Sequence, residues 1–179
     1  MRKILTVLLA AISCVSVAQI GGTSAFTFAL IENSARHTAL GGISITNTDN
    51  DPGSAFQNPS LLNKSMHNTA SASYANHVAD LNYGFINYAR HWDSIGTFML
   101  SMGYYDYGKF ARTNIAGEEI GEFNAADYVF QIGYSRTFND KLSYGGNVKF
   151  LYSAYEAYVS TAAAIDLGIS YIDSANLLS

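Results

Sequence analysis

The stretch from Tyr128 to Tyr152 constrains the fold more than any other part of the chain, because its residues alternate in character. In its first half, apolar side chains take one parity and Gly, Ser, Thr and Gln take the other, which also holds Val129. After an F-N-D-K break, the second half alternates in the same way, with Ser, Gly, Asn and Lys on the polar parity. Successive side chains of a strand point to opposite faces. The pattern therefore predicts a hairpin with one apolar face, made by Tyr128, Phe130, Ile132, Tyr134, Leu142, Tyr144, Val148, Phe150 and Tyr152.

Similar alternation recurs along the rest of the chain. Six strand-like runs are predicted, at residues 69–78, 81–90, 97–107, 128–137, 142–152 and 162–172. The connections at 91–96 and 138–141 are short, whereas 109–125 reads as a hairpin extension. In that extension we expect Lys109 and Arg112 to pair with Glu118, Glu119 or Glu122. The connections are thus predicted to alternate in length, with residues 175–179 beginning a seventh strand.

The environment of the two faces decides the fold class. Only 13% of residues are charged, and the polar parity carries few Lys or Glu. Tyrosines bracket the apolar runs at six and eight steps, about 20 and 26 Å, close to the ~25 Å apolar band of outer-membrane barrels. We therefore expect an antiparallel transmembrane β-barrel, with a soluble β-sandwich as the alternative. Six strands cannot close a barrel whose smallest form has about eight, so residues 66–179 are interpreted as its first half.

The first 18 residues have the form of a secretory signal peptide. Arg2 and Lys3 precede an apolar core, and Ser16-Val17-Ala18 resembles a cleavage site, so cleavage is expected between Ala18 and Gln19. A buried helix and a lipoprotein signal at Cys14 are the alternatives. Export fits an envelope protein. The net charge of −4 comes without a basic block, so nothing points to nucleic acid.

Residues 19–65 differ from the strands that follow, because they are rich in Gly and Asn and lack Tyr. A short helix is predicted at 34–40, ended by Gly41 and Gly42. A turn cluster follows at 49–53, with single helical turns at 54–57 and 60–63 on either side of Pro59.

Several motifs in this order resemble the PorQ-like proteins of the type IX secretion system, which belong to the wider group of FadL-like barrels. The chain carries Q-I-G-G-T-S-A-F from residue 19, N-S-A-R-H-T-A-L-G-G from residue 33 and Q-N-P-S-L-L-N from residue 57, and later Y-G-F-I-N-Y-A-R-H and Y-G-K-F-A-R-T. The resemblance implies an N-terminal plug or hatch at 19–65 inside the barrel. Its motif residues are Ala35, Arg36, Leu40, Gly41, Gly42, Asn58 and Pro59.

The resemblance also implies a location and a role. The protein is expected in the outer membrane of a Gram-negative bacterium, as a non-enzymatic scaffold of the secretion system. It would anchor a PorZ-like surface protein alongside PorU-like and PorV-like partners. The family's chain is close to twice this length, so the sequence is interpreted as an N-terminal fragment. A FadL-like channel for small hydrophobic molecules and a soluble periplasmic β protein are the alternatives.

The residues themselves indicate no catalytic or cofactor chemistry. No Ser is followed three residues later by Lys, and K-T-G is absent, so the acyl-enzyme motifs are missing. Asn47, Asp49 and Asp51 have calcium-loop spacing, but Pro52 takes the required Gly position, so a turn is the better interpretation. The four histidines show no metal spacing. One charged pair, Lys149 and Asp166, lies on the polar parity and is a candidate lumenal ion pair.

Overall fold

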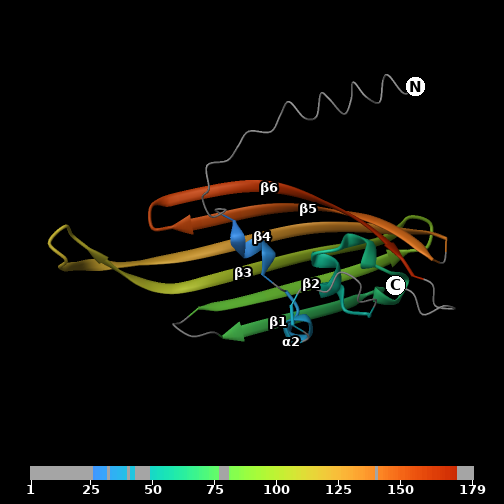
Figure 1. Ribbon diagram of the computed structural model, residues 1–179, viewed down its shortest axis with the longest axis horizontal. Helices are drawn as coiled ribbons and strands as arrows, with labels where there is room; N and C mark the ends of the chain where they lie inside the picture. Colours follow the sequence, from blue (N-terminus) through green and yellow to red (C-terminus); the bar gives the residue numbers. More distant parts are fainter. Residues whose placement is uncertain are drawn as a thin grey trace, which may run out of the picture.

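The computed structural model describes residues 26–31, 33–39, 41–42, 49–76, 81–139 and 141–172. Predictions on the signal peptide, on Ala18 and Gln19, on Leu40, on Asn47 and on residues 175–179 lie outside these ranges. The described strands form one six-stranded antiparallel sheet in chain order, which is open and not closed into a barrel (Figure 1). Its strands are β1 Thr69–Asn76, β2 Asn82–Trp92, β3 Gly96–Thr113, β4 Glu119–Asn139, β5 Leu142–Tyr155 and β6 Tyr158–Tyr171.

The predicted strands are all present, and two of them are much longer than expected. β3 and β4 continue past their neighbours as a two-stranded ribbon that projects from the sheet (Figure 1). The extension predicted at 109–125 is thereby confirmed. Its Lys109 Nζ lies 2.9 Å from the Glu122 carboxylate, as expected. Arg112 instead pairs with Glu156, from the turn after β5.

The prediction that connections alternate in length is wrong at the end of β5. Tyr155 pairs with Tyr158, so only Glu156 and Ala157 form the turn into β6. Glu156 adopts a positive φ of 55° there, as tight hairpin turns require. β6 consequently begins four residues before the predicted residue 162. The connections at the two ends of the sheet therefore do not fall into short turns and long loops. What distinguishes one end is the projecting β3–β4 ribbon.

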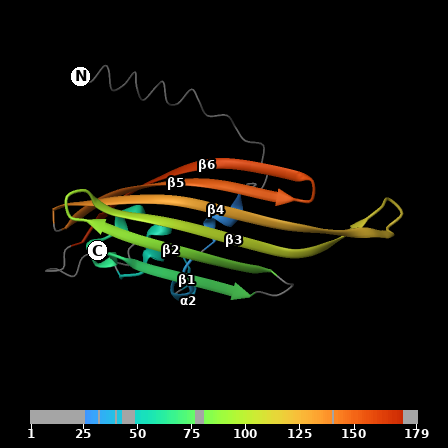
Figure 2. The ribbon, with the colours of Figure 1, turned by 180° about the vertical axis from the view of Figure 1, so that it is seen from behind.

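The face that we call the outer face presents large apolar side chains. Registered partners line up in rows across the sheet, such as Leu100, Ile132 and Val148, whose side chains are 60%, 60% and 57% exposed. Ile86, Met102, Phe130 and Phe150 form the next row. The parity predicted for β4 and β5 is thus confirmed. Figure 2 shows this face free of the short helices.

The opposite, covered face lies against the N-terminal segment, which consists of short helices (Figures 1 and 2). The helix predicted at 34–40 is confirmed as α2, and Gly41 and Gly42 end it with φ of 102° and 107°. Among the described residues, no helix has the length and apolarity needed to cross a membrane. The helices are η1 Thr27–Leu30, α2 Ala35–Ala39, η2 Pro52–Phe56, η3 Pro59–Leu61 and η4 Lys64–Met66.

Short polar side chains begin the last three of these helices. Asp51, Asn58 and Asn63 each accept a hydrogen bond from the backbone N–H two residues later. This capping satisfies N–H groups that a helix start leaves unpaired. Pro52 and Pro59 occupy the first helical positions, where a missing N–H costs nothing. The turns expected at 54–57 and 60–63 therefore start earlier, at the prolines.

The hydrophobic core lies between the N-terminal segment and the covered face. Phe28 and Phe56 reach it from the segment and contact Phe85 and Tyr105, with ring centroids 5.4 to 5.5 Å apart. This contact explains the irregular pattern of β2. Phe85 faces the core while Ile86 faces outward, so both parities of β2 are apolar.

Candidate functional site

The covered face is the candidate site because it buries polar residues that a strand would ordinarily expose. Asn87, Ser101 and Gln131 are each 1% exposed, and Asn147 is fully buried. Burying a polar group costs free energy unless it is hydrogen-bonded. Their placement therefore favours hydrogen-bond partners, and those of Asn147 come from the N-terminal segment.

One polar row runs straight across the covered face. Ser71, Asn87, Ser101, Gln131 and Lys149 follow one another in register from β1 to β5. The Asn87 amide donates to Ser71 Oγ at 3.2 Å, and Ser101 Oγ donates to Asn87 Oδ1. Neither amide atom of Gln131 has a hydrogen-bond partner among the described residues. The row links five strands beneath the N-terminal segment.

Asn33 connects the start of the segment to this row. Its Nδ2 donates to Asn87 Oδ1 at 3.4 Å, and its backbone carbonyl accepts a hydrogen bond of 2.6 Å from Ser73 Oγ. Asn33 itself is 1% exposed. The residues just before α2 are therefore held against β1 and β2.

Asn147 likewise binds the N-terminal segment to the sheet, from β5. Its Nδ2 donates to the carbonyls of Ala55 and Phe56, at 3.1 and 3.3 Å. Those carbonyls belong to η2, where a short helix leaves its last acceptors unpaired. Sequence reasoning did not single out Asn147 or Asn33. For Asn147 the only signal was its place on the small, polar parity, and Asn33 was only the first residue of a longer motif.

The motif residues Asn58 and Pro59 lie against two glycines of the sheet. A Cβ on Gly145 would sit 2.7 Å from the Pro59 carbonyl, and one on Gly168 would collide with Asn58 Oδ1. Ser170 Oγ also donates to the Ser60 carbonyl at 3.2 Å. Glycine on β5 and β6 is therefore what allows η3 to approach the strands so closely.

The structure brings Lys149 and Asp166 together on the covered face. Lys149 Nζ lies 2.8 Å from Asp166 Oδ2, and the ammonium sits 4.5 Å from the centroid of the Phe56 ring. The Lys149 side chain is 8% exposed and that of Asp166 is 32% exposed. The lysine thus carries a nearly buried charge that both the carboxylate and the aromatic face stabilise.

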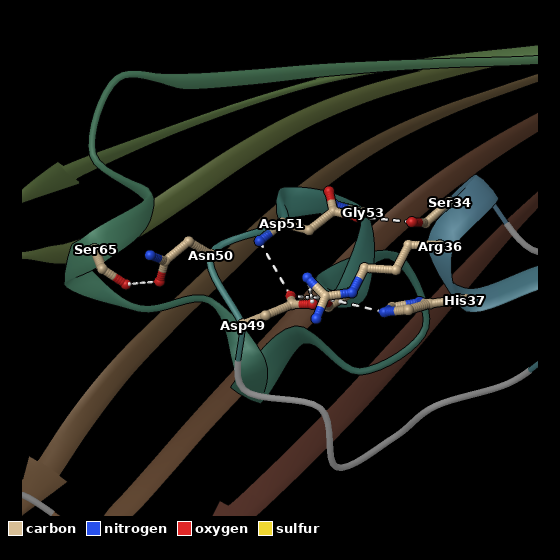
Figure 3. Close-up of polar contacts among 9 residues, drawn as sticks. Ser34, Arg36, His37, Asp49, Asn50, Asp51, Gly53 and Ser65 are labelled. Carbon is tan, nitrogen blue, oxygen red and sulfur yellow. Dashed lines mark hydrogen bonds and ion pairs between the residues drawn. The ribbon is translucent and has the colours of Figure 1, made fainter. Parts of the chain in front are cut away.

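Arg36, which follows Ala35 at the start of α2, belongs to a second polar cluster, shown in Figure 3. The Arg36 guanidinium lies 2.9 Å from Asp49, whose other oxygen accepts from Ser54 Oγ at 2.9 Å. Asp51 accepts from Ser34 Oγ at 2.7 Å. The turn predicted at 49–53 is thus tied to α2. Its carboxylates are engaged by protein donors, which supports the turn over a calcium loop.

This cluster also contains a serine–histidine pair, which is the described contact most similar to a catalytic one. Ser54 Oγ lies 3.3 Å from His37 Nε2. A serine nucleophile must reach a substrate carbonyl, yet Ser54 and His37 are 1% and 2% exposed. The contact therefore holds η2 against α2. No group of three or more His, Cys, Asp or Glu in the described ranges is placed to hold a metal ion.

At the end of the sheet opposite the ribbon, a polar cavity of about 550 Å³ lies under η4. Lys64 Nζ lies 3.1 Å from Asp93, whose carboxylate is also 3.5 Å from His91 Nε2. The hydrogen bond and positive charge of Lys64 lower the pKa of Asp93. His91 Nδ1 lies 2.9 Å from Thr97 Oγ1. These contacts tie η4 to the turn between β2 and β3.

A buried carboxylate occupies the covered face near the ribbon. Asp127 Oδ2 accepts hydrogen bonds from the hydroxyls of Tyr107, at 2.6 Å, and Tyr155, at 3.2 Å. The two tyrosine rings lie 5.7 Å apart. The cluster joins β3, β4 and β5 where the ribbon leaves the sheet.

Comparison with known proteins did not identify a family for this chain. No protein-family model matches the chain, and no curated protein is significantly similar to it.

Proposed function

We propose that the sheet is part of the wall of an outer-membrane β-barrel, with the outer face against lipid. The supporting observation is inverted burial: large apolar side chains are exposed on the outer face while Asn87, Gln131 and Asn147 are buried on the other. Burying apolar surface gains roughly 25 cal/mol per Å², so rows of exposed Ile, Leu and Phe are unfavourable in water. Hydrocarbon removes that penalty.

Two rows of aromatic side chains on the outer face support the same proposal. Tyr104, Tyr128 and Tyr152 form one row, with neighbouring ring centroids 5.0 and 6.0 Å apart. Phe98 and Tyr134 form the other, 4.9 Å apart. Six residues separate the rows on β4, roughly 20 Å at 3.3 Å per residue. Aromatic residues gather at both edges of the lipid band in such barrels.

The proposal needs further strands beside β1 and β6. Open sheet edges leave backbone N–H and C=O groups unpaired, at a cost of several kcal/mol each in hydrocarbon. In the proposed barrel, the plug predicted at residues 19–65 lies on the lumen side. Lys149 and Asp166 then form a lumenal ion pair beneath that plug.

The proposed role is that of a non-enzymatic scaffold in type IX secretion, anchoring a PorZ-like surface protein alongside PorU-like and PorV-like attachment proteins. The motif resemblance carries this role. The positions of its residues support it, because Arg36, Asn58 and Pro59 hold the N-terminal segment in place. A FadL-like channel is the alternative. Phe28 and Phe56 are buried against Phe85 and Tyr105. This packing favours a plug that stays in place over one that leaves a channel for small molecules.

Alkaline carbonate extraction of cell envelopes tests the barrel. The protein should stay in the membrane pellet, and its release into the soluble fraction would contradict the lipid-facing assignment.

Deleting the gene tests the role. Secreted cargo should then remain unattached at the cell surface, and the intact gene should restore attachment. Normal attachment together with reduced uptake of a radiolabelled fatty acid would instead support the channel.

A further inference from the structure

The outer face carries very few charges, and they are unevenly placed. Within the described strands between the two ends of the sheet, its charged residues are Arg90, Arg136 and, by register, Asp106. Both arginines lie towards the end opposite the ribbon, whereas Asp106 lies at the base of the ribbon. An otherwise apolar face thus has a cationic edge.

Arg90 stands over an aromatic cluster at this edge. Its guanidinium carbon lies 5.0 Å from the centroid of the Trp92 ring, which contacts Phe98 at 5.2 Å. Tyr134 follows beside Phe98, and its hydroxyl donates to the Ile95 carbonyl at 2.7 Å. Trp and Tyr are enriched where membrane meets water. The aromatic cluster therefore places Arg90 at the level of the membrane–water interface in the proposed barrel.

Arg136 lies two residues beyond Tyr134, is paired in register with Tyr144 and also lines the cavity under η4. In the described part of the chain, neither Arg90 nor Arg136 has an ion pair or hydrogen bond through its guanidinium. Asp93, an acid in the adjacent turn, is engaged by Lys64 and His91. Two guanidinium groups at the border of an apolar face are thus left for an external anion.

Phosphate fits these guanidinium groups better than other anions at such a border. A planar guanidinium binds phosphate oxygens through two parallel hydrogen bonds while its face stacks on an aromatic ring. Arg90 and Arg136 are separated by two strand spacings and two residues in register, roughly 12 Å from strand geometry. This is the separation of the two backbones, and it allows each guanidinium to contact a lipid headgroup of its own.

We propose that Arg90 and Arg136, together with Trp92, Tyr134 and Tyr144, bind the phosphates of anionic phospholipids at the tight-turn end of the outer face. The inference rests on the proposed function, because it requires the outer face to lie in a bilayer. It adds a specific lipid class and a specific leaflet, the periplasmic one in the orientation that places the ribbon outside.

The single tryptophan of the chain provides the test. The complete barrel, with any tryptophan other than Trp92 replaced by Phe, is reconstituted into vesicles of phosphatidylcholine containing either brominated phosphatidylglycerol or brominated phosphatidylcholine at equal mole fraction. Quenching of Trp92 then reports which lipid occupies the site. Each arginine near the membrane surface favours an anionic lipid by up to about fivefold. We expect the relative binding constant of phosphatidylglycerol to exceed that of phosphatidylcholine several-fold, and to fall in 0.5 M salt as charges are screened.

The double variant Arg90→Gln, Arg136→Gln should bring the relative binding constant close to one. Lys109→Gln, a cation on the ribbon, is the matched control and should leave the preference unchanged. Equal preference for both lipids in the wild-type chain, or an undiminished preference in the double variant, would overturn the proposal while leaving the barrel intact. Quenching by neither lipid would instead remove the membrane assignment itself, and this inference with it.

Discussion

A charged substitution at the centre of the outer face tests whether that face lies in lipid or in water, because its cost in stability differs greatly between the two. Ile132 is 60% exposed and lies between Leu100 and Val148 in its row. On β4 it is one residue, about 3 Å, from the midpoint between Tyr128 and Tyr134. In the proposed barrel that places it close to the bilayer midplane.

The substitution Ile132→Arg therefore has two very different expected costs. At the midplane of a barrel, Arg on the lipid face destabilises by about 2–4 kcal/mol. On a strand surface exposed to water, a substitution away from special features changes stability by less than about 0.5 kcal/mol. We expect about 3 kcal/mol, roughly two powers of ten in the folded-to-unfolded ratio.

Guanidinium unfolding in lipid vesicles, followed by Trp92 fluorescence, measures this cost as a shift in midpoint at constant slope. Ile120→Arg is the matched control, because Ile120 is 59% exposed but lies on the projecting ribbon. It should change stability by less than about 0.5 kcal/mol. If both variants unfold at the same guanidinium concentration, the outer face does not lie in lipid and the reasoning fails.

Three further predictions concern the N-terminal segment and its contacts. Asp166→Asn should destabilise by about 2–3 kcal/mol in the same unfolding assay, since it leaves the Lys149 charge nearly buried and unpaired. Gly145→Ala should push Pro59 off the sheet and increase protease cleavage within residues 49–66, read by mass spectrometry. The carboxyl of Asp93 should titrate below its ordinary pKa by NMR, so its ion pair persists above that pKa and is lost as the pH falls through the lowered value.

Each of these predictions has a matched comparison. Lys149→Met should cost less than Asp166→Asn, because the remaining carboxylate is one-third exposed and can be hydrated; a larger cost would contradict the assigned burial. Gly146→Ala adds a methyl only 3.4 Å from a flexible Leu167 side chain, so unchanged cleavage is expected. Lys64→Gln should return the pKa of Asp93 towards its ordinary value, and an unmoved titration would remove Lys64 as the cause.

Alternation predicted the sheet well where only one of its faces is apolar. Ile165, Leu167 and Ile169 on β6 are apolar while Asp166, Gly168 and Ser170 oppose them, so the outward face could be assigned from period two alone. On β2 the pattern failed because Phe85 is buried by the N-terminal segment while Ile86 faces outward. Where the N-terminal segment packs against a strand, the covered face also needs apolar residues, so the alternation is lost.

The candidate site was only partly accessible to sequence reasoning. Asn58 and Pro59 could be named from a motif, and Lys149 with Asp166 from their shared parity. Asn147 could not, because nothing nearby in sequence indicates that its partner is the Ala55 carbonyl, 92 residues away. The Arg112–Glu156 pair was missed for a similar reason, since it requires knowing that β5 ends beside the ribbon.

The order in which the chain leaves the ribosome differs from the order in which its contacts can form. Each strand pairs only with its sequence neighbours, so the sheet can grow one hairpin at a time at little loop-closure cost. Ser60, by contrast, meets Ser170 across 110 residues. The segment that is synthesised before the sheet can therefore complete its packing only after β6 has been added, although Phe28 and Phe56 can meet Phe85 and Tyr105 as soon as β2 and β3 are in place.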